Sequence, residues 1–497
     1  MKVKLVLFFV FASMLLHAQK SKNIFLERSF WKSKPTLELV KQKIEEGNDP
    51  TQLNRHSFDA IAYGLLEKSD VVSDDIIKYL LTIKGNGVNK ITHDGRTYIF
   101  WAAYTNRVDL MKYLVSKGAK TDIIDSHGYS VLNFAATAGQ TNTKLYDYLI
   151  SQGANPKVEK SKSGANAILL VIPSLKNLDL VDYFVSKGLK LTDTDYKGNG
   201  AVNYATKKGN KTIIDLLIKR GLQFKELNKN GGNAMIMASQ GGRRGYNSLE
   251  FFKYLEGLGV QANIRNKQGL TPLHNLAYSN KDIQTIQYFI QKGTDVNSKN
   301  EEGNTALINA SSSNSLAVIK LLRKHTKDIN EVNTKGQSTL TRAMRNTPKV
   351  IKYLLEQNAN VSVKDKKGNN LGYYLAQTYS SKKEEEFISK IQLLKERGFD
   401  FTTPQKDGNT LLHLAADKGD VSLLKFLKAF NINVNAKNND GVTALQKAVM
   451  VAKNPKIIEY LLRQGADKSV TTSFDETVLD LAKENEQLSK FDLNFLK

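Results

Sequence analysis

A single glycine recurs along this chain at intervals close to 33 residues, and this period constrains the fold more than any other feature. Consecutive members lie 32 to 40 residues apart, which is too long for a coiled-coil heptad and too regular for chance. Such self-similarity is typical of proteins that stack small structural units along one axis. The anchor glycines are Gly95, Gly128, Gly164, Gly198, Gly231, Gly269, Gly303, Gly336, Gly368, Gly408 and Gly441.

The residues after each anchor glycine predict a short helix. Two positions after it stands Ser, Thr, Asn or Gly, residue types favoured at a helix N-cap, where a side-chain oxygen can accept an unpaired backbone N–H. Four positions after it the residue is apolar in ten of the eleven units, and seven positions after it eight units carry Ala. The predicted N-caps are Thr97, Ser130, Asn166, Gly200, Asn233, Thr271, Thr305, Ser338, Asn370, Thr410 and Thr443.

A second helix is predicted in each unit, for example in IIDLLIKRG (213–221) and IIEYLLRQG (457–465). Its apolar residues fall at i, i+3 and i+4, so one stripe is buried. It ends at Gly or Asn in ten units, because these residues tolerate the left-handed conformation that closes a helix. Asp or Asn stands three positions before most anchors, where its side chain sets up a turn. One unit cannot enclose its own apolar stripe, so the units must stack.

Two segments resemble the ankyrin repeat closely: DGNTLLHLAADKGDVSLLKFLKAFNINVNAKNNDG (407–441), and QGLTPLHNLAY (268–278), which carries the family's TPLH core. The resemblance implies an all-α repeat solenoid of stacked ankyrin helix-turn-helix units with short β-turn or hairpin fingers. We expect eleven ankyrin repeats over 95–474. Degenerate ankyrin-like units are expected to cap the array at 19–94, and a partial capping unit at 475–497. Most units lack the Pro and the His of the family pattern.

The first residues have the layout of a secretory signal. Lys2 and Lys4 precede an apolar stretch of twelve residues (5–16), which only Ser13 interrupts, and a small-residue cleavage site follows at Ala18. We therefore expect residues 1–18 to be a signal peptide and the protein to be exported, to the periplasm or, alternatively, out of the cell. A buried N-terminal helix is the other interpretation, although it would lack a polar face. No later segment approaches the roughly 18 apolar residues that a membrane span needs, and the chain has no cysteine.

The sequence carries no supported catalytic motif, since its one Ser-x-x-Lys match, at Ser422 and Lys425, lies in a predicted second helix without a partner motif. It has no His-Glu-x-x-His pair, no Walker loop and no dinucleotide fingerprint. His274 and His413 stand where the ankyrin pattern places a structural histidine. His93 and His127 flank turn glycines of consecutive units and could lie close together, but without a carboxylate partner they make a weak metal site. We expect no enzyme, no metal and no cofactor; a hidden enzyme would require converging carboxylates or histidines in a deep pocket.

Lysine recurs just before the anchor glycines, at the tips that the ankyrin resemblance makes fingers along the concave face. The net charge of +23 favours anionic partners, and repeated tip lysines could form a basic ridge. The alternative is that they only keep the surface soluble. An insertion, GGRRGYNS (241–248), adds two arginines in the loop between two helices, at the end away from the fingers. The partner-binding candidates are Lys162, Lys197, Lys229, Lys267, Lys335, Lys366, Lys367, Lys406, Arg243 and Arg244.

The resemblance implies a scaffold without catalysis that binds a protein partner through its concave face and fingers. The excess of basic residues favours an acidic partner, and we expect a monomer. A second hypothesis is an electrostatic binder of an anionic polymer or membrane surface through the basic ridge. Nucleic acid is not an expected partner, because the compartment is wrong and the fingers lack interleaved aromatic residues.

Overall fold

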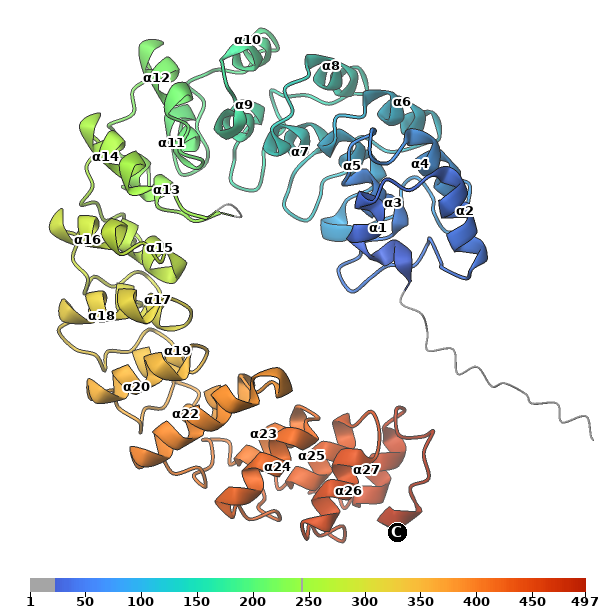
Figure 1. The fold of residues 1–497 in the computed structure, drawn as a ribbon, viewed down its shortest axis with the longest axis vertical. Helices are drawn as coiled ribbons and strands as arrows, with labels where there is room; N and C mark the ends of the chain where they lie inside the picture. The colour runs from blue at the N-terminus through green and yellow to red at the C-terminus, as the bar shows by residue number, and fades with distance from the viewer. Residues whose placement is uncertain (1–22, 243–244) are drawn as a thin grey trace, which may run out of the picture. The chain divides into compact units, whose positions relative to one another are not determined.

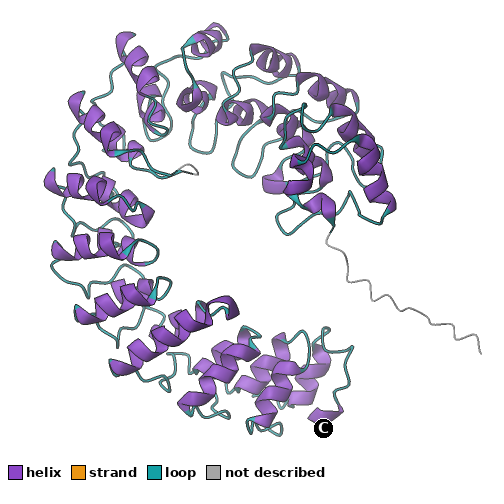
Figure 2. Ribbon diagram, viewed as in Figure 1, coloured by secondary structure: helices purple, strands orange, loops and turns teal. Residues whose placement is uncertain are grey.

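The computed structural model of the chain describes residues 23–242 and 245–497. These residues form helices and loops, and three isolated β-bridges are the only strand pairing among them (Figures 1 and 2). The predicted all-α repeat solenoid is confirmed. The chain divides into two compact units, residues 1–205 with 212–222, and residues 206–211 with 223–497. The predicted signal peptide lies outside the described residues.

The amino-terminal unit pairs a first and a second helix in each repeat. First helices pack on first helices, as α3, α5, α7 and α9 do in turn, and α6 packs on α8 in the second row. Its helices, some preceded or followed by a short 3-10 turn, are η1 (Ile24–Leu26), α1 (Arg28–Lys32), α2 (Leu37–Glu45), α3 (Ala60–Leu65), α4 (Asp74–Leu81), η2 (His93–Gly95), α5 (Tyr98–Tyr104), α6 (Val108–Ser116), α7 (Val131–Ala138), α8 (Thr143–Ser151), α9 (Ala167–Val171), η3 (Ile172–Ser174), α10 (Asp179–Ser186), α11 (Ala201–Thr206) and α12 (Lys211–Lys219).

The carboxy-terminal unit repeats the same arrangement. Odd-numbered helices from α13 to α27 are the first helices of their repeats, and even-numbered helices from α14 to α26 are the second (Figure 1). Its helices are α13 (Ala234–Ala238), α14 (Leu249–Gly257), α15 (Pro272–Ser279), α16 (Ile283–Gln291), α17 (Ala306–Ser311), α18 (Leu316–Lys324), α19 (Thr339–Ala343), α20 (Pro348–Glu356), α21 (Leu371–Gln377), η4 (Ser381–Lys383), α22 (Glu384–Glu396), α23 (Leu411–Asp417), α24 (Val421–Leu427), η5 (Lys428–Phe430), α25 (Ala444–Val451), α26 (Lys456–Arg463), α27 (Val478–Glu484) and η6 (Asn494–Leu496).

The anchor glycines occupy turns whose backbone conformation is energetically unfavourable for residues with a Cβ atom. All eleven have φ between 72° and 84°, in the left-handed region. At Gly303 a Cβ would also lie 2.8 Å from the backbone nitrogen of Thr334 in the next finger. Ten of the eleven predicted N-caps begin a first helix; for Gly200 no cap geometry is described. The glycine period therefore reflects both backbone conformation and close finger stacking.

Neighbouring fingers of the carboxy-terminal unit are joined by one backbone hydrogen bond each. The amide of Lys267 donates to the Asn230 carbonyl at 2.9 Å, and the amide of Glu301 donates to the Gln268 carbonyl at 2.8 Å. The same contact repeats at Thr334, Lys366, Lys406 and Asn439. The bridges Val332–Ser338 and Lys437–Thr443 give two fingers the predicted hairpin form.

Asparagine side chains tie the first helices α15, α17 and α25 to the repeat that follows each of them. Asn314 Nδ2 donates to the carbonyls of Ala277 and Asn280, at 2.8 and 3.0 Å, at the end of α15. Asn346 does the same for the end of α17, through the carbonyls of Ser311 and Asn314. Because the last carbonyls of a helix have no partner within it, these buried amides act as C-caps delivered from the following repeat.

Candidate binding site on the first-helix face

The finger lysines are exposed, but they are not equivalent. Lys162 Nζ donates to the Ser126 carbonyl and Lys267 Nζ to the Lys229 carbonyl at 2.9 Å, so these two brace the preceding finger. Among the described residues, none of the eight forms an ion pair. Lys162 and Lys197 belong to the amino-terminal unit and the other six to the carboxy-terminal unit, so a basic ridge along the whole array stays a prediction. Arg243 and Arg244 lie outside the described residues.

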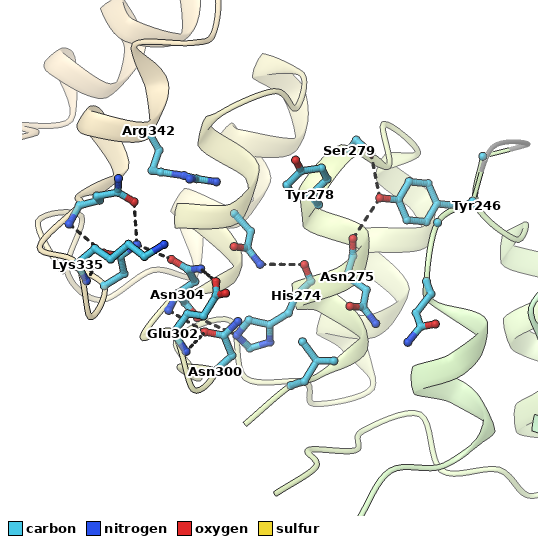
Figure 3. Close-up of a pocket in the computed structure, with 18 residues that line it drawn as sticks. Tyr246, His274, Asn275, Tyr278, Ser279, Asn300, Glu302, Asn304, Lys335 and Arg342 are labelled. Carbon is cyan, nitrogen blue, oxygen red and sulfur yellow. Dashed lines mark hydrogen bonds between the residues drawn. The ribbon is translucent and has the colours of Figure 1, made fainter. Parts of the chain in front are cut away.

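A pocket of about 850 Å³ lies on the face formed by first helices α15, α17 and α19, their fingers and the loop after α13 (Figure 3). We call this side of the carboxy-terminal unit the first-helix face. Its lining residues come from four successive repeats, including Gly241, Gly242, Gly245 and Tyr246 of the insertion. The lining includes the side chains Tyr246, Asn275, Tyr278, Glu302, Asn309, Lys335 and Arg342.

Tyr246 attaches the insertion to the first-helix face. Its hydroxyl donates to the Asn275 carbonyl at 3.2 Å and lies 2.9 Å from Ser279 Oγ, both in α15. The insertion was expected at the end of the helix pair away from the fingers. The structure adds that this loop and the fingers at 300–304 and 333–337 line one pocket, because the short first helices separate them by only two turns.

Asn275, Asn309 and Arg342 occupy the same position in three consecutive repeats, six residues after the anchor glycine. The amide nitrogens of the two asparagines donate to carbonyls of the preceding first helix, those of Ile236 at 3.3 Å and His274 at 3.0 Å. Their Oδ1 atoms have no hydrogen-bond partner among the described residues. The column is variable, holding Trp101 and Phe134 in the other unit, and it lies between columns that packing and capping explain.

Two cations line the pocket without an anion beside them. Arg342 is half-buried, and its Nε is buried with no hydrogen-bond partner in the described chain. Lys335 is exposed on the finger before α19. The one carboxylate of the pocket, Glu302, accepts a hydrogen bond from Asn304 Nδ2 at 2.9 Å and pairs with neither cation. Within the described residues the site is therefore a polar hollow with an excess of positive charge.

The histidine of the pocket has a structural role, as predicted. His274 Nδ1 accepts from the Thr271 amide at 3.1 Å, and Nε2 donates to the carbonyls of Ser298 and Asn304, both at 3.0 Å. Burial lowers the pKa of His274, which keeps the imidazole neutral. His413 makes the matching contacts in its repeat, and burial likewise lowers its pKa. With both ring nitrogens occupied, His274 offers the pocket neither a base nor a metal ligand.

His93 and His127 do share a carboxylate, contrary to the expectation from sequence. His127 Nε2 lies 3.1 Å from Asp94 Oδ2, and His93 Nε2 lies 3.3 Å from the same atom. Asp94 lies in the turn next to His93 with a φ of 58°, in the left-handed region, and its side chain reaches His127 in the next finger. Partial burial would raise the pKa of Asp94, but the hydrogen bond from His127 and the neighbouring His93 and Arg96 hold that pKa below its usual value. Across residues 23–242 and 245–497, no group of three or more potential ligands could hold a metal ion.

None of the helices in the described ranges is long and apolar enough to cross a membrane. Buried carboxylates in these ranges are paired within the fold: Asp59 contacts Lys90 Nζ at 2.8 Å, and Asp125 contacts Arg96 at 2.8 Å. The polar pocket on the first-helix face is suited to holding a ligand by hydrogen bonds and charge.

Stacked two-helix repeats with turn fingers and a pocket across several repeats define a repeat-built binding scaffold. A family model described as ankyrin repeats (3 copies) matches residues 69–160, 243–333, 276–365 and 378–472, more than half of the chain. The chain therefore belongs to the ankyrin repeat family, whose members serve as scaffolds for protein–protein interaction.

Curated relatives carry the same repeats within longer proteins. An ankyrin repeat protein of Acanthamoeba polyphaga mimivirus is 26% identical over 213 residues, 41% of this chain and 27% of that protein. The nuclear factor NF-kappa-B p105 subunit of Gallus gallus is 28% identical over 181 residues, 35% of this chain and 18% of that protein. Rabankyrin-5 of Mus musculus is 28% identical over 223 residues, 44% of this chain and 16% of that protein. The matched regions span less than a third of each relative.

Proposed function

We propose that this protein is a non-catalytic scaffold that binds a protein partner through the first-helix face and finger tips of its repeats. The observation that carries the proposal is that the positions of the repeat used by the fold differ from the positions that line the pocket. Caps, turns and core residues recur in most repeats and are used by the fold, whereas the variable column at Asn275, Asn309 and Arg342 lines the pocket. The pocket holds no converging set of carboxylates or free histidines, so binding is the chemistry it supports.

The proposal includes export and a monomeric state. The apolar start of the sequence supports a signal peptide, and cell fractionation with a carboxy-terminal tag tests it. Recovery of the full-length, uncleaved chain in the cytoplasm would contradict export. Light scattering after size-exclusion chromatography should give the mass of one chain.

Affinity capture tests the partner. Tagged protein is recovered from the exported fraction at low and at high salt, and bound proteins are identified by mass spectrometry. A partner retained by the wild type, and lost when Asn309→Leu and Arg342→Gln are introduced together, supports binding at the first-helix face. Retention by that double variant at wild-type strength would exclude this face as the binding surface.

A second candidate is an electrostatic binder of an anionic polymer or membrane surface, favoured by the eight exposed finger lysines. Changing Lys197, Lys229, Lys267 and Lys335 to Glu should then abolish binding to vesicles with anionic headgroups or to an acidic glycan. The matched control changes four exposed lysines of second helices, Lys320, Lys352, Lys425 and Lys456, to Glu. Equal loss in both variants would indicate a net-charge effect, and no loss in either would remove this candidate.

A further inference from the structure

We propose that the pocket between Tyr246 and Arg342 binds an extended, acidic segment of the protein partner, with one Asp or Glu carboxylate held by Arg342 and Lys335. The inference rests on the proposed scaffold function and specifies the ligand of its first-helix face. It concerns residues of this chain that lie outside the recurring columns of the repeat.

The acidic character follows from the unpaired cations. Arg342 Nε is buried without an acceptor, and no carboxylate lies within 4 Å of Arg342 or Lys335 among the described residues. A buried donor without a partner is unfavourable, and a guanidinium presents a planar fork that matches a carboxylate. The terminal guanidinium nitrogens of Arg342 also have no acceptor among the described residues, and a ligand carboxylate would pair with them from the open side of the pocket. Lys335 lines the same hollow and adds a second positive charge (Figure 3).

The extended peptide follows from the two asparagines. Their Oδ1 atoms are free acceptors on neighbouring first helices, and backbone N–H groups are the donors that an extended chain presents at regular intervals. Packed helices lie roughly 8–10 Å apart, which about three residues of an extended chain span. A segment of about six residues therefore reaches from Asn275 past Asn309 to Arg342, and a nine-residue peptide covers this stretch with residues to spare at its ends. The pocket volume of about 850 Å³ fits part of such a segment.

The walls of the pocket favour a peptide over a uniform polyanion. Glu302 lines the same hollow and would repel a second negative charge placed beside it. Tyr278, with 55% of its surface exposed, gives an apolar side chain of the segment something to pack against. The segment expected is one carboxylate within a partly apolar stretch, not a run of acids.

The probe is a phage library of random nine-residue peptides panned against the full chain. Enriched peptides should carry at least one Asp or Glu beside apolar residues. Synthetic copies should lose roughly 10- to 100-fold in affinity with Arg342→Gln, the loss of one charged hydrogen-bonded contact. Replacing the peptide's acid by its amide should cost as much, and should cost little more in the Arg342→Gln protein. Lys352 is exposed on α20, outside the pocket, so Lys352→Gln is the matched control and should change affinity less than twofold.

Arg342→Lys, which keeps the charge, should recover part of the affinity and guards against a folding defect, as does an unchanged far-UV circular dichroism spectrum. The chain has no cysteine, so Tyr278→Cys gives one thiol in the pocket. A bound peptide should slow its alkylation, but not that of Ser389→Cys, which is exposed on α22.

Enriched peptides without acids, affinity indifferent to Arg342→Gln, or no enrichment would each overturn the inference. Affinity capture of the partner distinguishes failure of this inference from failure of the proposed function. A partner captured equally by wild type and Arg342→Gln leaves the scaffold intact and removes the acidic segment, whereas the absence of any captured partner removes both.

Discussion

Replacing His274 tests whether hydrogen bonds through this one side chain join neighbouring repeats. Its imidazole is 2% exposed, accepts from the Thr271 amide and donates to two carbonyls of the next finger. His274→Ala removes a helix cap and leaves buried polar groups without partners, so unfolding free energy should fall by about 2–4 kcal/mol. His274→Gln should cost less than about 1 kcal/mol.

The chain itself provides the model for the glutamine variant. Gln446 holds the equivalent position in its repeat, where its Oε1 accepts from the Thr443 amide at 2.8 Å and its Nε2 donates to the Val470 carbonyl at 3.1 Å. The amide thus makes both the cap and the bond to the next repeat.

The two side chains differ in their response to acid. Burial lowers the pKa of His274 in the folded chain, while in the unfolded chain it is close to 6.5. Below pH 6.5 the imidazole of His274 therefore binds a proton in the unfolded state but stays neutral in the folded state. Stability is complete above that pH and declines as pH falls toward the folded pKa, by at most about 1.4 kcal/mol per pH unit. The His274→Gln variant lacks this pH-dependent loss of stability, because glutamine does not titrate.

Urea denaturation followed by circular dichroism at pH 7.5 and pH 5.5 measures both effects, and hydrogen exchange over residues 268–311 localises them, since an array need not unfold as one unit. Wild type should lose more stability than His274→Gln between the two pH values. The reasoning is refuted if glutamine and alanine are equally destabilising at pH 7.5, or if all three proteins respond identically to pH.

Three further substitutions test other features of the fold. Gly303→Ala should destabilise by at least about 1 kcal/mol more than Gly441→Ala in thermal unfolding, because both have positive φ but only at Gly303 does the added Cβ meet a neighbouring finger; equal losses would contradict the close-approach argument. Asp59→Ala should cost about 3–5 kcal/mol in unfolding monitored by the fluorescence of Trp31 and Trp101, since it strands buried contacts to Lys90 and Tyr98, whereas the exposed Asp75→Ala should change it by less than about 0.5 kcal/mol. Asn314→Ala should lower stability by about 2 kcal/mol and speed amide exchange at the end of α15, and unchanged exchange there would argue against capping from the next repeat.

The repeat itself was predictable because its signals are local. An anchor glycine, an N-cap two residues later and a closing Gly or Asn each reflect the backbone conformation of their own turn, and Gly303, Thr305 and Gly293 show all three. His274 and His413 were placed correctly for the same reason: half of their contacts lie within three residues.

The pocket was not predictable, because its residues meet only after four repeats have stacked. Nothing in the sequence around Tyr246 indicates that its hydroxyl reaches α15. Arg342 could have been suspected from the sequence. The position six residues after the anchor glycine holds an amide, aromatic or aliphatic residue in most other repeats, whereas this repeat holds an arginine. The carboxylate shared by His93 and His127 was missed although Asp94 is the residue next to His93, because its left-handed turn is not evident from composition.

The asparagine caps give the carboxy-terminal array a direction. Asn314 and Asn346 each reach backward to finish the first helix of the repeat before them, and Asn485 does so for α25 through the carbonyls of Val449 and Ala452. Shortening the protein from its carboxyl end after α15, α17 or α25 therefore leaves the last carbonyls of that helix without their cap. Shortening it from its amino end leaves the caps of the remaining helices in place. Fragments that end after α15, α17 or α25 should therefore keep the asparagine of the repeat that follows them.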